Sequence, residues 1–141
     1  MRVQRRGDNA HEWELYKGRA RIGIEWYFKE TTDLPISVML YHLEPGAEEG
    51  QHFHLEGVGD SCSPGSSDEM YVVTTGEVVI SSDDDQRILR AGDAFYARQG
   101  VRHGVRNESD APAELLLVFG PRGPHAFPQT GEEVFDVEAD R

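Results

Sequence analysis

The stretch GAEEGQHFH, residues 46–54, carries the strongest structural signal in this chain of 141 residues. His52 and His54 lie two positions apart in it. In a β-strand such positions project from the same face, so both imidazoles point one way and Phe53 points the other. Two converging neutral imidazoles can ligate a metal ion, although two surface histidines on a loop strand would give the same pattern. The stretch therefore predicts a strand and leaves a metal site open.

Segments on both sides of this stretch have the same strand character. Glycine, proline and runs of small polar residues cut the chain into short apolar or β-branched pieces, which span 36–43, 70–75, 77–80, 94–96 and 113–119. Short strands that are separated by frequent turn signals predict an all-β sandwich or barrel. Apolar residues do not recur at helical spacing over three turns, so we expect no long helix.

The domain organisation follows from three segments that depart from this rhythm. We expect a flexible N-terminal arm at 1–11, a barrel domain at 12–120 and an acidic C-terminal tail at 121–141. Within the barrel domain, the Gly/Ser/Asp-rich residues 55–68 form an inserted loop. The aromatic segment Trp13–Phe28 is expected to form strands that either close the barrel or pair with a second copy.

Composition excludes several classes of function. The formal net charge of -12 repels phosphate backbones and anionic headgroups, which argues against nucleic-acid and membrane-surface binding. The longest apolar run, Leu115 to Phe119, is far shorter than the roughly 20 residues of a membrane span. Cys62 is the only cysteine, so no intramolecular disulfide can form. We therefore expect a soluble cytoplasmic protein.

Two spaced motifs resemble those of the cupin superfamily. The first runs from Gly46 through His52 and His54 to Glu69 and Gly76, and the second runs from Gly92 through Arg98-Gln99-Gly100 and His103 to Asn107. The resemblance covers about residues 36–119. It implies a single-domain cupin, which is a double-stranded β-helix or jelly-roll barrel. It says much less about the reaction, because one barrel hosts many chemistries.

The resemblance implies that His52, His54, Glu69 and His103 ligate one divalent transition metal per chain. Three imidazoles and one carboxylate leave one or two positions open on the ion, as catalysis requires. This donor set suits iron, zinc, manganese, nickel or copper, and the donors alone do not choose among them. Because oxygen chemistry is our first functional hypothesis, we favour Fe(II).

Two positions depart from the family pattern. Fourteen residues separate His54 from Glu69, where the usual cupin has three or four. Glu56 is nearer to His54, but only Glu69 opens a clear strand and precedes Gly76 by the right distance, so we prefer Glu69. The other departure is Arg98, which stands where the motif usually has proline and lacks its fixed turn geometry.

Strand parity predicts the residues that line the pocket. If Glu69 points inward, Tyr71 and Val73 do so too, while Asp68 turns away. If His103 points inward, so do Val105 and Asn107. Glu69 and Tyr71 are thus the candidate catalytic residues, although a core tyrosine with its hydroxyl satisfied is the more usual role for a residue such as Tyr71.

The inserted loop 55–68 is anchored beside the predicted metal ligands. It could be a lid with glycine hinges or a solvated insertion, since long surface loops cost little closure entropy. Cys62 within it is either a further ligand or redox group, or an incidental thiol.

Three functions remain open from sequence. The first is an Fe(II) dioxygenase or oxygenase-type reaction on a small organic substrate. The second is a zinc, manganese or nickel enzyme that acts as an isomerase, lyase or condensing enzyme of a bacterial biosynthetic pathway. The third is a non-catalytic module that binds a small molecule. The filled ligand positions favour the two enzymes, and the aromatic segment together with open sheet edges predicts a homodimer.

Overall fold

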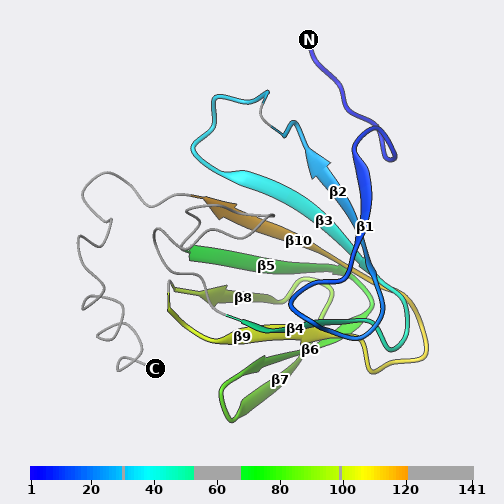
Figure 1. The fold of residues 1–141 in the computed structure, drawn as a ribbon, viewed down its shortest axis with the longest axis vertical. Helices are drawn as coiled ribbons and strands as arrows, with labels where there is room; N and C mark the ends of the chain where they lie inside the picture. Colours follow the sequence, from blue (N-terminus) through cyan, green and yellow to red (C-terminus); the bar gives the residue numbers. More distant parts are fainter. Residues whose placement is uncertain (30, 53–67, 99, 121–141) are drawn as a thin grey trace.

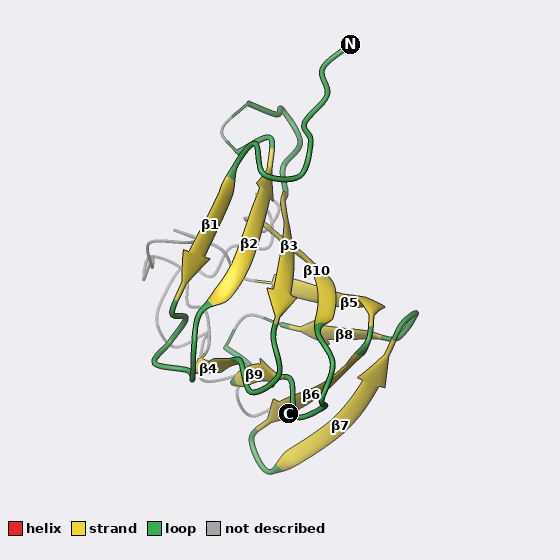
Figure 2. Cartoon of the chain, turned by 90° about the vertical axis from the view of Figure 1, so that its right-hand side faces the viewer, coloured by secondary structure: helices red, strands yellow, loops and turns green. Residues whose placement is uncertain are grey.

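The computed structural model describes residues 1–29, 31–52, 68–98 and 100–120. Within these ranges the chain forms strands and loops and no helix (Figures 1 and 2). The strands are β1 (Ala10–Trp13), β2 (Ile22–Tyr27), β3 (Ser37–Leu43), β4 (Glu48–His52), β5 (Asp68–Thr75), β6 (Glu77–Ser82), β7 (Asp85–Arg90), β8 (Ala94–Ala97), β9 (His103–Arg106) and β10 (Ala113–Gly120). The all-β prediction is confirmed. The same ranges contain no helix long and apolar enough to cross a membrane.

The strands form two antiparallel sheets. The six-stranded sheet has the order β1-β2-β3-β10-β5-β8, and the four-stranded sheet has the order β4-β9-β6-β7. Figure 1 shows the central strands of the larger sheet side by side, with the smaller sheet beyond β8. The strand order does not follow the sequence, because the last strand, β10, lies between β3 and β5. It therefore occupies a central position in the six-stranded sheet.

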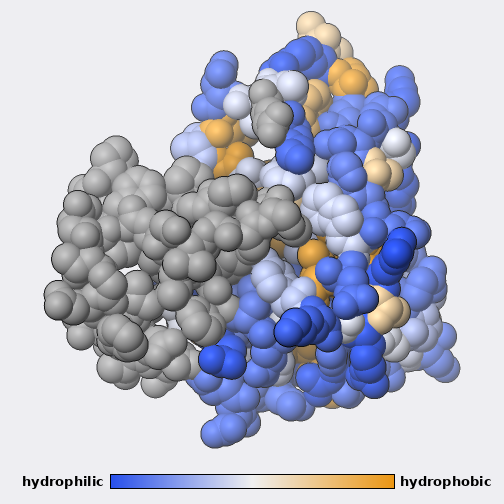
Figure 3. All heavy atoms as spheres, viewed as in Figure 1, coloured by the Kyte–Doolittle hydropathy of each residue, from blue (hydrophilic) through white to orange (hydrophobic). Residues whose placement is uncertain are grey.

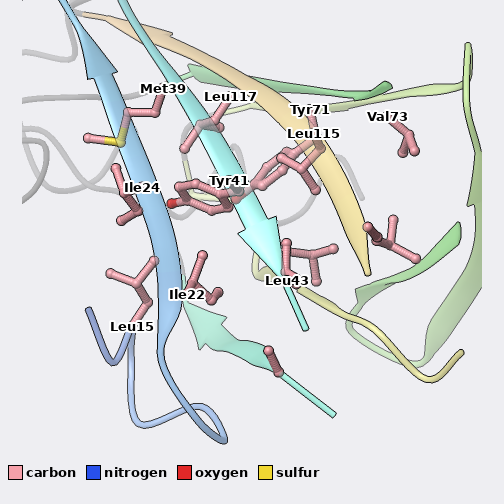
Figure 4. Close-up of a cluster of buried hydrophobic side chains, with 14 of the residues drawn as sticks. Leu15, Ile22, Ile24, Met39, Tyr41, Leu43, Tyr71, Val73, Leu115 and Leu117 are labelled. Atoms are coloured by element: carbon pink, nitrogen blue, oxygen red, sulfur yellow. The ribbon is translucent and has the colours of Figure 1, made fainter. Parts of the chain in front are cut away.

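The hydrophobic core lies between the sheets, and alternating burial along the strands defines it. In β10 every second residue from Ala113 to Phe119 is buried. Met39 and Tyr41 in β3, and Tyr71 and Val73 in β5, point to the same interior (Figure 4). The predicted inward orientation is therefore confirmed for these strands, and Val105 and Asn107 are buried as well.

The N-terminal segment that we expected to be a flexible arm is bonded to β2. The Gln4 amide donates to the Glu25 carboxylate at 2.7 Å and to the Trp26 carbonyl at 3.1 Å. Glu25 also accepts the N–H groups of Gly7 and Asn9. Burial alone would raise the pKa of Glu25, but these hydrogen bonds to its ionised form lower it below the ordinary value.

The aromatic segment Trp13–Phe28 contributes to the chain's own core. Trp26 is buried, and its ring meets Trp13 edge-on at a centroid distance of 6.3 Å and Phe119 at 5.9 Å. This packing buries rings of the segment in the chain's own core. The homodimer stays a prediction.

Two motif residues have structural roles. Gly76 has a φ of +78°, and a Cβ there would lie 2.7 Å from the Pro112 carbonyl oxygen, so only glycine fits this β5–β6 turn. The side-chain amide of Asn107 donates to the carbonyls of Leu43 and Ala111 at 3.0 and 2.8 Å. The motif spacing thus reflects how turns are fixed around the barrel as well as chemistry.

The surface reflects the acidic composition. In the orientation of Figure 1, hydrophilic side chains dominate and hydrophobic ones are scattered (Figure 3). The polar run at 81–85 contains a hairpin turn, since β6 ends at Ser82 and β7 begins at Asp85. Repulsion among the acidic groups keeps this surface solvated.

Candidate metal centre

The candidate site lies between the two sheets, where β4 ends and β9 begins. His52 is the last residue of β4 and pairs directly with His103, the first residue of β9. Their ring centroids are 4.5 Å apart, and both side chains are buried. Antiparallel pairing therefore brings together two imidazoles that are 51 positions apart in the sequence.

Each imidazole is fixed by a backbone carbonyl two residues before it. The Nδ1 of His52 is 2.8 Å from the Gly50 oxygen, and the Nδ1 of His103 is 2.8 Å from the Val101 oxygen. A ring that donates through Nδ1 presents the lone pair of Nε2 as its ligand atom. This arrangement is typical of histidines that bind metals.

A third donor, Glu49, joins the two histidines. Candidate ligand atoms of Glu49, His52 and His103 all lie within 4.8 Å of one another, and the three residues are buried. Strict strand alternation would put Glu49 and His52 on opposite faces, because they are three residues apart. The register shift in β4 between these residues places both in the interior.

The bulged part of β4 requires a glycine. A Cβ on Gly50 would lie 1.9 Å from the Tyr16 carbonyl oxygen, and the Gly50 N–H donates to the Leu15 carbonyl at 3.0 Å. The loop after β1 thus packs tightly on the backbone of β4. This contact also places the Tyr16 ring parallel to His52, with a centroid distance of 3.5 Å and an interplanar angle of 6°.

The six-stranded sheet supplies a hydrogen-bonding wall opposite these donors. Tyr41 donates to Glu49 Oε2 at 2.9 Å. The Tyr71 hydroxyl lies 2.8 Å from Glu49 Oε1 and 3.0 Å from Glu69 Oε2, so it bridges two buried carboxylates. Glu69 Oε2 is in turn 2.7 Å from His103 Nε2. These contacts form one connected network.

Burial shifts the acid–base properties of this network. Burial and the neighbouring Glu69 charge raise the pKa of Glu49 to about 7. Burial and the charges of Glu49 and Glu69 raise the pKa of Tyr41 and of Tyr71 well above the ordinary value. Two acidic groups so close together hold protons more tightly than they would in water.

His103 is the basic member of the network. Burial alone would lower the pKa of His103, but the hydrogen bond and charge of Glu69 raise it above the ordinary value. A metal ion binds neutral imidazole, so it would displace the proton held between His103 and Glu69. A divalent cation would also offset the charges of the two carboxylates. The donor set therefore fits a divalent metal ion.

The structure brings together three of the four predicted ligands. His103 is hydrogen-bonded to Glu69, the His52 ring packs against His103, and Tyr71 bridges Glu69 to Glu49. His54, Glu56 and Cys62 lie outside the described residues, as does the predicted loop 55–68 except for Asp68, which opens β5. Asp68 turns away as expected, because its carboxylate accepts the Tyr96 hydroxyl on the exposed side.

Sequence reasoning missed Glu49, Tyr41 and Tyr16 as site residues. Strand alternation predicts that Glu49 points away from the face of His52, so the sequence did not indicate it as a ligand. The local signal for a bulge is Gly50, which lies inside an otherwise polar strand. Alternation puts Tyr41 on the same face of β3 as Met39, but nothing in the sequence pairs its hydroxyl with Glu49. Tyr16 is in a loop, and no periodic pattern predicts its contact with His52.

The fold and the site define a class of protein, namely a small antiparallel β-protein with buried imidazole and carboxylate donors between its sheets. A family model described as Cupin domain matches residues 39–119. The chain therefore belongs to the cupin family. The predicted family and fold are confirmed, and cupins commonly bind a divalent metal.

Individual relatives are more distant. Protein SchB of Streptomyces halstedii is 30% identical over 82 residues, which are 58% of this chain and 52% of that protein. The chain thus matches about half the length of this relative.

Solved structures support the fold. A predicted oxalate decarboxylase of Thermotoga maritima superposes with a TM-score of 0.72 at 21% identity, covering 86% of this chain and 100% of that one. A sugar phosphate isomerase from a cupin superfamily, from Silicibacter pomeroyi, has a TM-score of 0.57 at 25% identity, covering 73% and 60%. The first of these likenesses concerns the fold alone.

Proposed function

We propose that this chain is a metal-dependent enzyme that acts on a small organic substrate at the cluster of Glu49, His52 and His103. The observation that carries the proposal is the burial of these three donors within 4.8 Å of one another. The Nδ1 contacts of both histidines add support, since they orient the rings for ligation through Nε2. The net charge of -12 favours a small molecule over a nucleic acid as the substrate.

His52 and His103 would hold the ion through Nε2, and Glu49 would supply a carboxylate oxygen. His54 is a further predicted ligand, and Glu69 is placed to bind the ion or to accept a proton beside it. A bound divalent ion supplies Lewis acidity and, as iron, redox chemistry with O2. Our first candidate reaction is an Fe(II) dioxygenase or oxygenase-type oxidation.

The second candidate is a non-redox isomerase, lyase or condensing reaction with zinc, manganese or nickel. The bridging Tyr71 hydroxyl favours it, since it joins Glu49 to Glu69 at 2.8 and 3.0 Å and gives a short path for proton transfer. The likeness to the sugar phosphate isomerase is also compatible with chemistry of this kind.

Metal analysis followed by oxygen measurement tests the proposal. The protein would be purified without added metal, assayed for bound transition metals, and then loaded separately with Fe(II) and Zn(II). Oxygen consumption would be followed with panels of phenols, 1,3-dicarbonyl compounds, dicarboxylates and sugar phosphates. We expect about one metal ion per chain, as one cluster of donors predicts.

The outcomes separate the candidates. Substrate-dependent O2 uptake by the iron-loaded chain supports the oxygenase. Turnover of a substrate by the zinc-loaded chain without O2 uptake supports the non-redox enzyme. A chain that binds none of these ions after loading contradicts both.

A further inference from the structure

Gly23, inside β2, is a glycine that the surrounding backbone does not require. Its φ lies outside the left-handed region, and within 4 Å a Cβ there would meet only the paired His42, whose own Cβ would be 3.4 Å away. The glycines of β4 and β9 differ, because a Cβ on Gly50 or Gly104 would lie 1.9 or 2.9 Å from a backbone oxygen. A glycine inside a strand costs stability and often marks the close approach of another backbone or of a ligand. At Gly23 the described chain supplies no such backbone, so the position is suited to a ligand.

A hollow of about 450 Å³ lies at this glycine, on the side of the six-stranded sheet opposite the core. We call it the Gly23 hollow. Strand register places Gly23 in one row with Glu12, His42, Glu114 and Thr75, and all five residues line the hollow. The other four carry side chains and Gly23 carries none, so the row is open at β2. The volume lies within the range of about 300–1,000 Å³ that is usual for small-molecule sites.

The rest of the lining is mainly apolar. Ala10, Glu25 and Leu40 form the next row across β1, β2 and β3. Gly7 in the N-terminal segment and Pro112 before β10 also line the hollow. The Gly7 N–H donates to Glu25 at 2.8 Å, which fixes the N-terminal segment against the sheet. A ligand in the hollow therefore needs an apolar body that packs on Leu40 and Pro112.

The basic side chains of the lining already have partners. Arg6 and His42 contact the same carboxylate oxygen, Glu114 Oε2, and His42 does so at 3.1 Å. The ring of His11, the other titratable base, lies 3.1 Å from the side-chain oxygen of Asn9. The positive charge of Arg6 is thus offset within the lining and is not directed at an anionic ligand.

Two carboxylates of the lining keep a negative charge. Three uncharged groups donate to Glu25, namely the Gln4 amide and the N–H groups of Gly7 and Asn9. Burial would raise the pKa of Glu25, but these hydrogen bonds lower it, so the buried group is ionised at neutral pH. Glu12 is exposed on β1 and forms no ion pair within the described part of the chain. The two residues are diagonal neighbours on adjacent strands, so their negative charges act together.

We propose that the Gly23 hollow binds a small organic cation, which is an ammonium group on a compact apolar body. The ammonium group would lie between Glu12 and Glu25, and the body would lie over Gly23 against Leu40. Another copy of this chain suits the hollow poorly, because its net charge of -12 would bring acidic surface to these carboxylates. The site is separate from the metal centre, since Leu40 points outward from β3 and Tyr41 points into the core.

Titration of the ¹⁵N-labelled full chain with 2-phenylethylamine, followed by NMR, tests this proposal. We expect saturable shifts of the Gly7 and Gly23 amide signals with a Kd on the order of 0.1–1 mM, which suits so small a ligand. 2-Phenylethanol has a similar body without the charge, and 3-phenylpropionate has the opposite charge. Both should bind at least about 10-fold more weakly, because the carboxylates of the lining attract a cation and repel an anion.

Gly23→Val is the decisive variant, since it fills the hollow from the strand itself. The backbone at Gly23 and the space around its Cβ allow a side chain, and valine is favoured in strands, so the variant should fold. We expect it to weaken binding of 2-phenylethylamine by at least about 10-fold, because the new side chain overlaps the ligand body. Glu12→Gln keeps the shape but removes a charge, and it should weaken binding by roughly 2- to 5-fold, as for an exposed ion pair.

Ala94→Val and Glu14→Gln are the matched controls. Ala94 is exposed on β8 of the same sheet, Glu14 is exposed after β1, and neither residue lines the hollow. These substitutions make the same kinds of chemical change elsewhere, so both variants should bind the amine as the parent protein does. Circular dichroism confirms that each variant is folded.

Several outcomes would overturn the proposal. One is an amine that causes no saturable shift of these signals, and another is a Gly23→Val variant that binds it as the parent protein does. Equal binding of 3-phenylpropionate would contradict the choice of a cation. Binding that is lost when a chelator removes bound metal would place the amine at the metal centre instead. A Gly23 signal that shifts on dilution of the ligand-free protein would show that a second copy fills the hollow. The metal content of the parent protein tests the proposed function separately.

Discussion

The four-stranded sheet contributes Glu49, His52 and His103 to the site, whereas the six-stranded sheet contributes Tyr41, Glu69 and Tyr71. The first wall holds imidazoles oriented by backbone carbonyls, together with a carboxylate. The second wall holds hydroxyls that donate to the carboxylates and a glutamate that contacts His103. The difference suggests a division of labour, in which one wall binds the ion and the other controls the charge and protons around it.

Loss of an imidazole from the ligand wall should have the largest effect. We expect His103→Ala and His52→Ala each to weaken Zn²⁺ binding by more than about 100-fold, since removal of a ligand costs more than the 10- to 100-fold typical of its supporting hydrogen bonds. Metal content after dialysis is the measurement. His54→Ala should behave likewise if that predicted residue is a ligand.

His42→Ala is the control for these variants. His42 lies on the opposite side of β3 and contacts Glu44 and Glu114 rather than the site. It should keep the metal content of the parent protein. Near one ion per chain in both His52→Ala and His103→Ala would refute the site.

The carboxylates give the next largest effect and compare the two walls directly. We expect Glu49→Gln to weaken Zn²⁺ binding by roughly 10- to 100-fold, because the variant keeps the shape of the side chain but removes the negative charge that offsets the ion. Glu69→Gln should weaken binding less, since Glu69 Oε2 lies against His103 Nε2 and acts on the ion partly through that ring. Calorimetric titration measures both.

The opposite ranking would restore Glu69 as the main carboxylate ligand, as the motif resemblance implies. Glu56→Gln belongs in the same series, because Glu56 is the alternative that the long insertion left open. We expect it to bind metal like the parent protein. Loss of the metal in Glu56→Gln alone would show that the motif was aligned wrongly across 55–68.

Much of the fold and part of the site could be predicted from the sequence, because strand alternation and motif spacing are both regular. Alternation in β5 and β10 is regular, so the inward positions of Tyr71 and Val73 could be read from the residues. His103 was found through its spacing from Gly92 in the second motif. Turn glycines and inward side chains recur at fixed distances, and sequence analysis detects such distances.

The site residues that the sequence did not predict lie where the strand alternation is interrupted or where the chain forms a loop. Glu49 reaches the interior through a bulge, and a bulge shifts parity without a strong sequence signal. Tyr16 reaches His52 from a loop in which Tyr16, Lys17 and Ala20 all have positive φ angles. Such backbone angles in non-glycine residues are held by tertiary contacts, here with Gly50 and Glu48. Sequence patterns do not contain that information.

The hydroxyls of the second wall should contribute to stability rather than to metal binding itself. In metal-free protein, we expect Tyr71→Phe to lower the free energy of unfolding by about 2–3 kcal/mol, because two buried carboxylates lose the hydroxyl that bridges them. Tyr41→Phe removes a donor from Glu49 alone and should cost about 1–2 kcal/mol. Urea unfolding at neutral pH compares them. Equal losses would mean that Glu69 gains nothing from Tyr71.

The smallest expected effect concerns Tyr16, which comes from the loop between β1 and β2 and stacks on His52 of the ligand wall. Its ring is parallel to His52 at a centroid distance of 3.5 Å, so we expect it to restrict the orientation of that imidazole. Tyr16→Leu should weaken Zn²⁺ binding by about 2- to 10-fold, the equivalent of the ~0.5–1.5 kcal/mol of an aromatic pair. Tyr16→Phe keeps the ring and should bind as the parent protein does. If Phe and Leu weaken binding equally, the ring stack does not orient His52, and the hydroxyl is the group that matters.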